Sequence, residues 1–228
     1  MLSYLSILFL SVYLPFYLCL FVIYLSYNLV NLSNATGYGC RTWVIGDSHV
    51  YWAGRSDAQL QGGGQVTWFG ERGGHLCDAV GIVKAKLARF PYPQTIVIHI
   101  GTNDIFTYNT FVIRQRIVAT LMGIRQLLPA TRIVWSDVLP RLYYYKEENA
   151  GSGRRIANFM NAQAHKVVRS MTNAVYINHN AVLPVSNWGL FRLDGLHLSE
   201  AGLLVLRMSW SEALVYFNTR SGAVAFPP

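Results

Sequence analysis

The chain has 228 residues, of which 52% are hydrophobic, and its formal net charge is +8 at pH 7. This length fits one domain of ordinary size with an appendage. The basic residues are scattered and form no run interleaved with aromatic residues, so no nucleic-acid partner is expected. Cys19, Cys40 and Cys77 form neither a disulfide framework nor a metal-ligand spacing, and no nucleotide-binding glycine motif occurs. We therefore expect no metal and no cofactor.

The first 40 residues contain no Asp, Glu, Lys, Arg or His. We therefore divide the chain into a hydrophobic leader, residues 1–38, and a folded domain, residues 39–228. About 20 apolar residues span a bilayer, so residues 4–30 favour a membrane anchor. A cleaved signal peptide and translated flanking sequence stay open as alternatives, although the leader lacks the basic start of a signal peptide. A genuine leader would make the protein membrane-associated or secreted.

From residue 42 onward, short apolar runs alternate with longer segments that have apolar residues at helical spacing. The expected strands are 42–46, 65–69, 95–101, 132–138 and 174–178. The expected helices are 75–89, 110–128, 153–171 and 199–217, the last with Ser199 as its N-cap. This alternation predicts an α/β fold with a parallel sheet covered by helices on both faces.

Polar residues come after three of these strands. Ser48 comes directly after the first strand, Asn103 after the third, and the loop 179–198 after the last. Ligands of such sheets bind beyond the carboxyl ends of the strands, so these segments are expected to meet at one edge. Asp47 is expected to fix the turn that presents Ser48.

A serine hydroxyl becomes a nucleophile only with a base and with donors that hold the oxyanion. Asp194 and His197 lie three residues apart before the last helix, a spacing that lets the carboxylate orient the imidazole as a general base. The Asn103 side chain and the backbone N–H groups of Ser48 and of the pair 73–74 are the candidate oxyanion donors. The plainer alternatives are that Ser48, Asn103 and these glycines are turn residues.

Four blocks in this order resemble the SGNH hydrolases, also called GDSL-like esterases and lipases. They are "GDSH" at 46–49, "RGGH" at 72–75, "GTND" at 101–104 and "DGLHLS" at 194–199, and the resemblance covers roughly residues 41–217. It implies a flavodoxin-like fold: a three-layer α/β/α sandwich with a five-stranded parallel sheet. It also implies hydrolysis of esters or acetyl groups on small molecules without a metal.

The resemblance also implies a role for each matching residue. Ser48 is the nucleophile, His197 the base and Asp194 its orienter, and Gly74 and Asn103 complete the oxyanion hole with the Ser48 amide. The sequence departs from the family at position 49, where His replaces the usual Leu. His75 also comes after the glycine pair, which leaves open whether Gly73 or Gly74 donates.

We therefore predict a serine hydrolase that forms a covalent acyl-enzyme. One alternative is an inactive binding module for an acyl or carbohydrate ligand, derived from a retroelement, since similar domains occur in some vertebrate retroelements. Another is a membrane-attached interaction protein. The loops 140–152 and 179–193 carry aromatic residues that either line a substrate pocket or pack the loops: Tyr143, Tyr144, Tyr145, Trp188 and Phe191.

Overall fold

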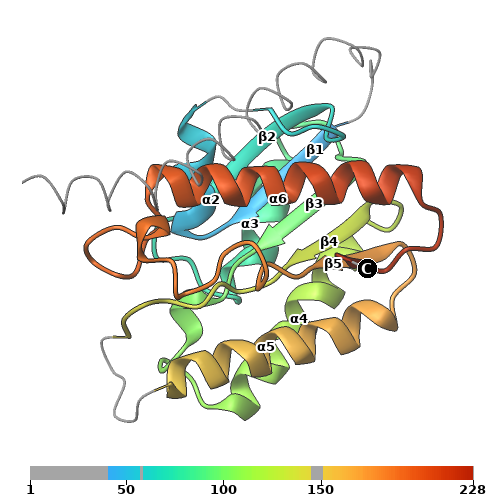
Figure 1. Cartoon of the computed structure of the whole chain (residues 1–228). Coiled ribbons are helices and arrows are strands. Elements are labelled where there is room, and N and C mark those ends of the chain that lie inside the picture. Colours follow the sequence, from blue (N-terminus) through green and yellow to red (C-terminus); the bar gives the residue numbers. More distant parts are fainter. Residues whose placement is uncertain (1–40, 57–58, 145–150, 228) are drawn as a thin grey trace, which may run out of the picture. The chain divides into compact units, whose positions relative to one another are not determined.

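The computed structural model describes residues 41–56, 59–144 and 151–227 and shows one open, entirely parallel sheet (Figure 1). The strands lie in the order β2-β1-β3-β4-β5-β6. Their bounds are Arg41–Gly46 (β1), Gln65–Gly70 (β2), Thr95–His99 (β3), Arg132–Ser136 (β4), Ala174–Ile177 (β5) and Ala225–Phe226 (β6). The five predicted strands are confirmed, and three of them (β3, β4 and β5) end earlier than predicted. The sixth strand was not predicted, because two residues carry no readable period.

Five α-helices accompany the strands in the described residues. They are Ser48–Ala53 (α2), Asp78–Leu87 (α3), Thr110–Leu127 (α4), Ser152–Arg169 (α5) and Glu200–Thr219 (α6). The four longer helices were predicted. Figure 1 shows α6 crossing one side of the sheet, with α4 and α5 on the other side.

The two faces of the sheet bury separate apolar clusters, because successive strand residues point to opposite faces. On β3, Ile96 and Ile98 pack into the cluster shared with α3, α4 and α5, whereas Val97 packs into the cluster shared with α6. On β4, Trp135 packs into the first of these clusters and Val134 into the second. The predicted three-layer α/β/α sandwich is therefore confirmed.

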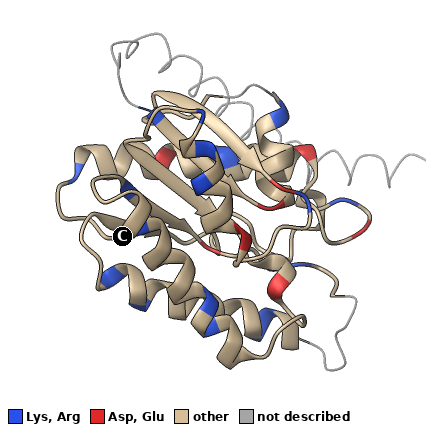
Figure 2. Ribbon diagram, turned by 180° about the vertical axis from the view of Figure 1, so that it is seen from behind, with Lys and Arg blue, Asp and Glu red and all other residues tan. Residues whose placement is uncertain are grey.

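No helix within residues 41–56, 59–144 and 151–227 is long and apolar enough to cross a membrane. The predicted anchor, residues 4–30, lies outside the described residues, so membrane attachment and the division at residue 38 stay predictions. Figure 2 shows Lys and Arg residues on several helices and loops of the domain.

Ser199 caps α6 as predicted. Its hydroxyl accepts a hydrogen bond from the Gly202 amide at 3.2 Å and donates one to the Gly189 carbonyl at 2.7 Å. We expect Ser199→Ala to lower the free energy of unfolding by about 1–2 kcal/mol, because both helix cap and loop contact are lost. Urea denaturation measures this change, and a loss below about 0.3 kcal/mol would contradict a capping role.

Candidate active site

Ser48 is the first residue of α2 and lies directly beyond β1. The Asp47 carboxylate caps this helix by accepting a hydrogen bond from the His49 amide at 3.1 Å, which confirms the predicted role of Asp47 in the turn. Ser48 is buried at the end of the strand, with 6% of the residue exposed. Among the described residues, no group forms a hydrogen bond with its hydroxyl. A hydroxyl held in place but unbonded is available to a base and a substrate.

Asp194 and His197 form the predicted pair. The Asp194 Oδ2 atom lies 2.7 Å from His197 Nδ1, and Oδ1 accepts hydrogen bonds from the Leu196 and His197 amides at 2.8 and 2.9 Å. Partial burial would raise the pKa of Asp194, but these hydrogen bonds outweigh it and lower the pKa to about 2. Asp194 is therefore ionised at neutral pH and fixes the His197 tautomer that leaves Nε2 free to accept a proton.

The loop that carries this pair is held by its own turn. Gly195 has φ +63°, a conformation that an L side chain rarely adopts, and this turn lets the chain reverse between Asp194 and His197. The Gly195 carbonyl accepts hydrogen bonds from the Leu142 and Tyr143 amides at 2.9 and 3.2 Å. The segment after β4 therefore supports the loop that carries Asp194 and His197.

Asn103 lies in a short 3-10 turn, Thr102–Asp104, beyond the end of β3. Gly101, at φ +127°, turns the chain into it. The Asn103 Nδ2 atom donates to the Gly74 carbonyl at 3.0 Å, so the structure brings "GTND" and "RGGH" together. One of the two Nδ2 protons is thus engaged, and the other has no partner in the described chain.

The two candidate glycines, Gly73 and Gly74, differ in the partners of their amides. The Gly74 amide donates to the Glu71 carbonyl at 3.1 Å, whereas the Gly73 amide has no partner among the described residues. Gly74 would have to release this bond to hold an oxyanion. The choice between Gly73 and Gly74 therefore stays open.

The segment that carries Ser48 and the loop that carries Asp194 and His197 lie at one edge of the sheet. Figure 1 shows α2 and the loop that precedes α6 (orange) on that side. Burial lowers the pKa of His49, the neighbour of Ser48, to about 4, and an interaction with His197 is among the smaller contributions to this shift. Ser48 and His197 are not hydrogen-bonded to each other, an arrangement common before substrate binds.

Arg141 interacts with residues of several of these segments, and the sequence did not indicate it. Its Nη2 atom donates to Asn103 Oδ1 at 3.1 Å, and its charge interacts with the carboxylates of Asp47 and Asp194. Burial lowers the pKa of Arg141, and these carboxylates oppose that shift. The available signal was its place in "DVLPR", directly beyond the carboxyl end of β4.

A chain of buried polar side chains runs beneath the site. His49 Nδ1 lies 3.4 Å from His99 Nε2, and His99 Nδ1 lies 2.9 Å from Ser136 Oγ. Ser136 Oγ lies 2.7 Å from His179 Nε2, and His179 Nδ1 lies 3.0 Å from Ser209 Oγ. Burial lowers the pKa of all three histidines, that of His49 to about 4, so the rings are neutral at pH 7.

Trp210 couples the tautomers of His99 and His179 to each other. Its indole N–H donates to Ser136 Oγ at 2.8 Å and takes one of the two lone pairs of that oxygen. Ser136 can then accept from one of His99 and His179 and must donate to the other. The two rings therefore carry their protons either both on Nδ1 or both on Nε2.

In the part of the chain that the structure describes, Asp47, His49 and His99 are the group with metal-ligand geometry, with ligand atoms within 4.8 Å of one another. Asp47 Oδ1 lies 3.6 Å from His49 Nδ1, and Oδ2 accepts a hydrogen bond from the Thr102 hydroxyl. A proton on His49 Nδ1 faces both the Asp47 carboxylate and His99 Nε2. Hydrogen bonds alone can therefore satisfy these three side chains when His99 and His179 both carry their protons on Nδ1.

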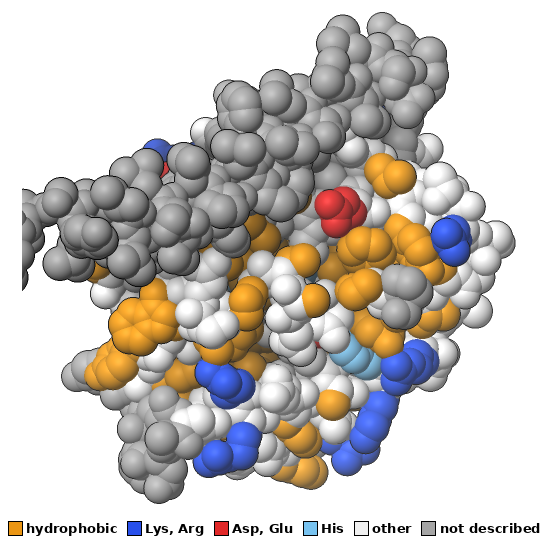
Figure 3. All heavy atoms as spheres, viewed as in Figure 1, with side chains coloured by type: hydrophobic (Ala, Val, Ile, Leu, Met, Phe, Trp, Pro, Cys, Tyr) orange, Lys and Arg blue, Asp and Glu red, His pale blue; other side chains and the backbone are white. Residues whose placement is uncertain are grey.

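The loop aromatics divide between packing the loops and reaching the surface. Tyr144 and Phe191 are buried and pack the loops. Tyr143 and Trp188 are exposed, Trp188 by 76%, and can meet a substrate. Figure 3 shows hydrophobic side chains reaching the surface on the face that carries α6. Tyr145 lies outside the described residues.

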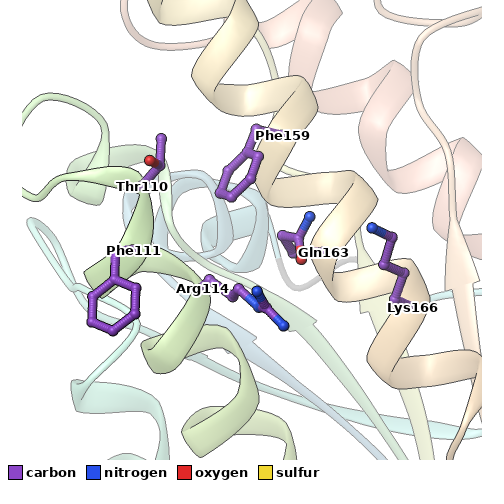
Figure 4. Close-up of a pocket in the computed structure, with 6 residues that line it drawn as sticks. All are labelled: Thr110, Phe111, Arg114, Phe159, Gln163 and Lys166. Atoms are coloured by element: carbon purple, nitrogen blue, oxygen red, sulfur yellow. The ribbon is translucent and has the colours of Figure 1, made fainter.

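A separate pocket opens between α4 and α5, and Figure 4 shows the six side chains that line it. They are Thr110, Phe111, Arg114, Phe159, Gln163 and Lys166. None of these residues belongs to the predicted site. The pocket therefore adds nothing to the chemistry at the sheet edge.

Comparison with known proteins gave matches among solved structures, whereas no family model and no curated protein matches. A GDSL-like lipase from Bacteroides thetaiotaomicron is 17% identical, with a TM-score of 0.58 over 77% of this chain and 88% of that chain. An acetyl xylan esterase from Geobacillus stearothermophilus is 18% identical, with a TM-score of 0.55 over 77% and 94%. A member of the lipolytic G-D-S-L family from Veillonella parvula is 15% identical, with a TM-score of 0.59 over 79% and 100%.

These structures share the open parallel sheet between helix layers, over nearly their whole length. The four sequence blocks fall at the carboxyl edge of that sheet or in the loops beside it, where the resemblance requires them. The chain therefore has the α/β fold of the SGNH hydrolases, the fold of GDSL-like lipases and esterases.

Proposed function

We propose that the chain is a serine hydrolase that cleaves ester or acetyl groups from small molecules through an acyl-enzyme on Ser48. The observation that carries this proposal is the pair Asp194–His197, fixed by three hydrogen bonds, at the same sheet edge as an unbonded serine hydroxyl and the Asn103 amide. The names of the solved neighbours, a lipase and an acetyl xylan esterase among them, support carboxylic esters as the substrate class.

The proposed reaction has two halves. His197 Nε2 takes the proton of Ser48 as Oγ attacks the ester carbonyl, and Asp194 stabilises the imidazolium that forms. The Asn103 amide and backbone N–H groups hold the oxyanion, and His197 then protonates the leaving alcohol. Water, activated by the same histidine, releases the acid and restores Ser48.

The proposal is tested by hydrolysis of p-nitrophenyl acetate, butyrate and octanoate by the full-length chain. We expect turnover, with an initial burst of p-nitrophenol if release of the acyl group is slow. The rates along this series report the acyl length that the site accepts. A folded protein that gives neither burst nor turnover with any of the three esters would contradict the proposal and favour the binding module.

A further inference from the structure

The Asn103 side chain is held at both ends of its amide. Oδ1 accepts from Arg141 Nη2 at 3.1 Å, and Nδ2 donates to the Gly74 carbonyl at 3.0 Å. A guanidinium can only donate and a carbonyl can only accept, so both contacts require the same orientation of the amide. The second Nδ2 proton is left for a substrate oxygen.

Arg141 is restricted by burial and by charge. The residue is half-buried, its backbone amide donates to the Tyr144 hydroxyl at 3.1 Å, and the guanidinium charge interacts with the carboxylates of Asp47 and Asp194. A bond from a cation to Oδ1 polarises the amide and strengthens its N–H groups as donors. The same cation offsets two carboxylates that would otherwise disfavour a developing oxyanion.

We propose that Arg141 is a positioning residue of the oxyanion site, which orients the Asn103 amide and strengthens it as a donor. This inference rests on the proposed function, because the amide holds an oxyanion only if Ser48 attacks a carbonyl. Arg141 acts through Asn103 and touches no reacting atom.

The test compares ester hydrolysis by the full-length wild-type chain with that of Arg141→Met, Arg141→Lys, Asn103→Ala and the double variant Arg141→Met/Asn103→Ala. Removing one oxyanion donor lowers kcat by about 10²–10³-fold, which we expect for Asn103→Ala. We expect Arg141→Met to lower kcat by about 10–100-fold with KM nearly unchanged, since a misdirected donor is lost mainly in the transition state.

The double variant isolates the role of Arg141. Because Arg141 acts through Asn103, the double variant should be no slower than Asn103→Ala alone. Arg141→Lys keeps the positive charge but lacks the planar guanidinium, so its kcat should lie between those of Arg141→Met and the wild type. The control is Arg114→Met, the same change on an exposed arginine of α4, which should leave kcat and KM unchanged.

A second measurement does not depend on turnover. In ¹⁵N-labelled protein, the two Nδ2 protons of Asn103, assigned by their loss in Asn103→Ala, should give separate resonances that move toward each other in Arg141→Met. An Arg141→Met variant that is folded, with kcat within twofold of wild type or with unchanged Asn103 resonances, would overturn the inference. A double variant whose loss in kcat equals the product of the two single losses would also overturn the inference. Absence of turnover in the wild type would instead count against the proposed function.

Discussion

Replacing Ser48 with alanine is expected to lower kcat for ester hydrolysis by about 10⁴–10⁶-fold, because the variant cannot form the acyl-enzyme. The residual rate would come from water attacking a carbonyl that the oxyanion donors still polarise. KM should change little, since Ser48 contributes no binding contact beyond the attack itself. Steady-state kinetics on purified wild type and variant give both constants.

The same substitution should leave stability unchanged or slightly higher. Ser48 is buried, with 6% of the residue exposed, and its hydroxyl has no hydrogen bond in the described chain, so its removal costs no interaction. The control is Ser170→Ala, which removes a hydroxyl that donates to the Val167 carbonyl at the end of α5, far along the chain from Ser48, and should keep full activity. A Ser48→Ala variant with more than a tenth of the wild-type kcat would show that another group attacks the substrate.

Acid is expected to destabilise the domain strongly through its three buried histidines. The pKa values of His49, His99 and His179 are lowered by burial, that of His49 to about 4, whereas the unfolded chain titrates near 6.5. Below that pH the unfolded chain binds protons that the folded domain does not bind, so the free energy of unfolding falls as the pH falls. For His49 this shift corresponds to a loss of about 2 kcal/mol between pH 7 and pH 5, and the lowered pKa values of His99 and His179 act in the same direction.

Two carboxylates reduce this loss. Burial raises the pKa values of Asp104 and Asp137, so the folded domain binds their protons more readily than the unfolded chain. We therefore expect a net fall of about 2 kcal/mol between pH 7 and pH 5, the size of the His49 contribution and a sizeable share of the stability of an ordinary domain. Urea denaturation at pH 7, 6 and 5 measures it.

A variant identifies the histidines as the cause. His179→Gln keeps groups that can bond Ser136 and Ser209 but does not titrate, so its stability should fall less steeply with pH, by up to about 1 kcal/mol per pH unit between pH 7 and pH 5. The absolute stability of this variant is not the criterion. Equal slopes for wild type and variant, or a free energy of unfolding that stays constant from pH 7 to pH 5, would be incompatible with buried neutral histidines.

The sequence predicted those features that depend on local pattern. Continuous apolar runs such as 95–99 identified central strands of a parallel sheet, and helical spacing identified the helices that cover it. The pair Asp194–His197 was predictable because three residues in one turn bring both side chains together. Ser48 and Asn103 were predictable because the loops beyond the carboxyl ends of parallel strands lie at one edge of the sheet.

The features that were missed depend on contacts between distant segments. His99 pairs with Gly46 of β1, and Ser136 pairs with Ile177 of β5, so the buried histidine chain exists only in this register. A single histidine in the sequence is typical of a structural residue, and nothing local indicates a row of three. Arg141 was missed for the same reason, because its contact with Asn103 joins residues 38 positions apart.

The most direct test of the Ser48–His197–Asp194 mechanism is the reaction of the full-length chain with a fluorophosphonate, with mass spectrometry of the modified peptide. This mechanism predicts one adduct per chain on Ser48, with labelling abolished in Ser48→Ala and strongly slowed in His197→Ala, because only a serine activated by its histidine reacts readily. A folded wild-type chain that remains unlabelled, or that is labelled equally fast without His197, would contradict it.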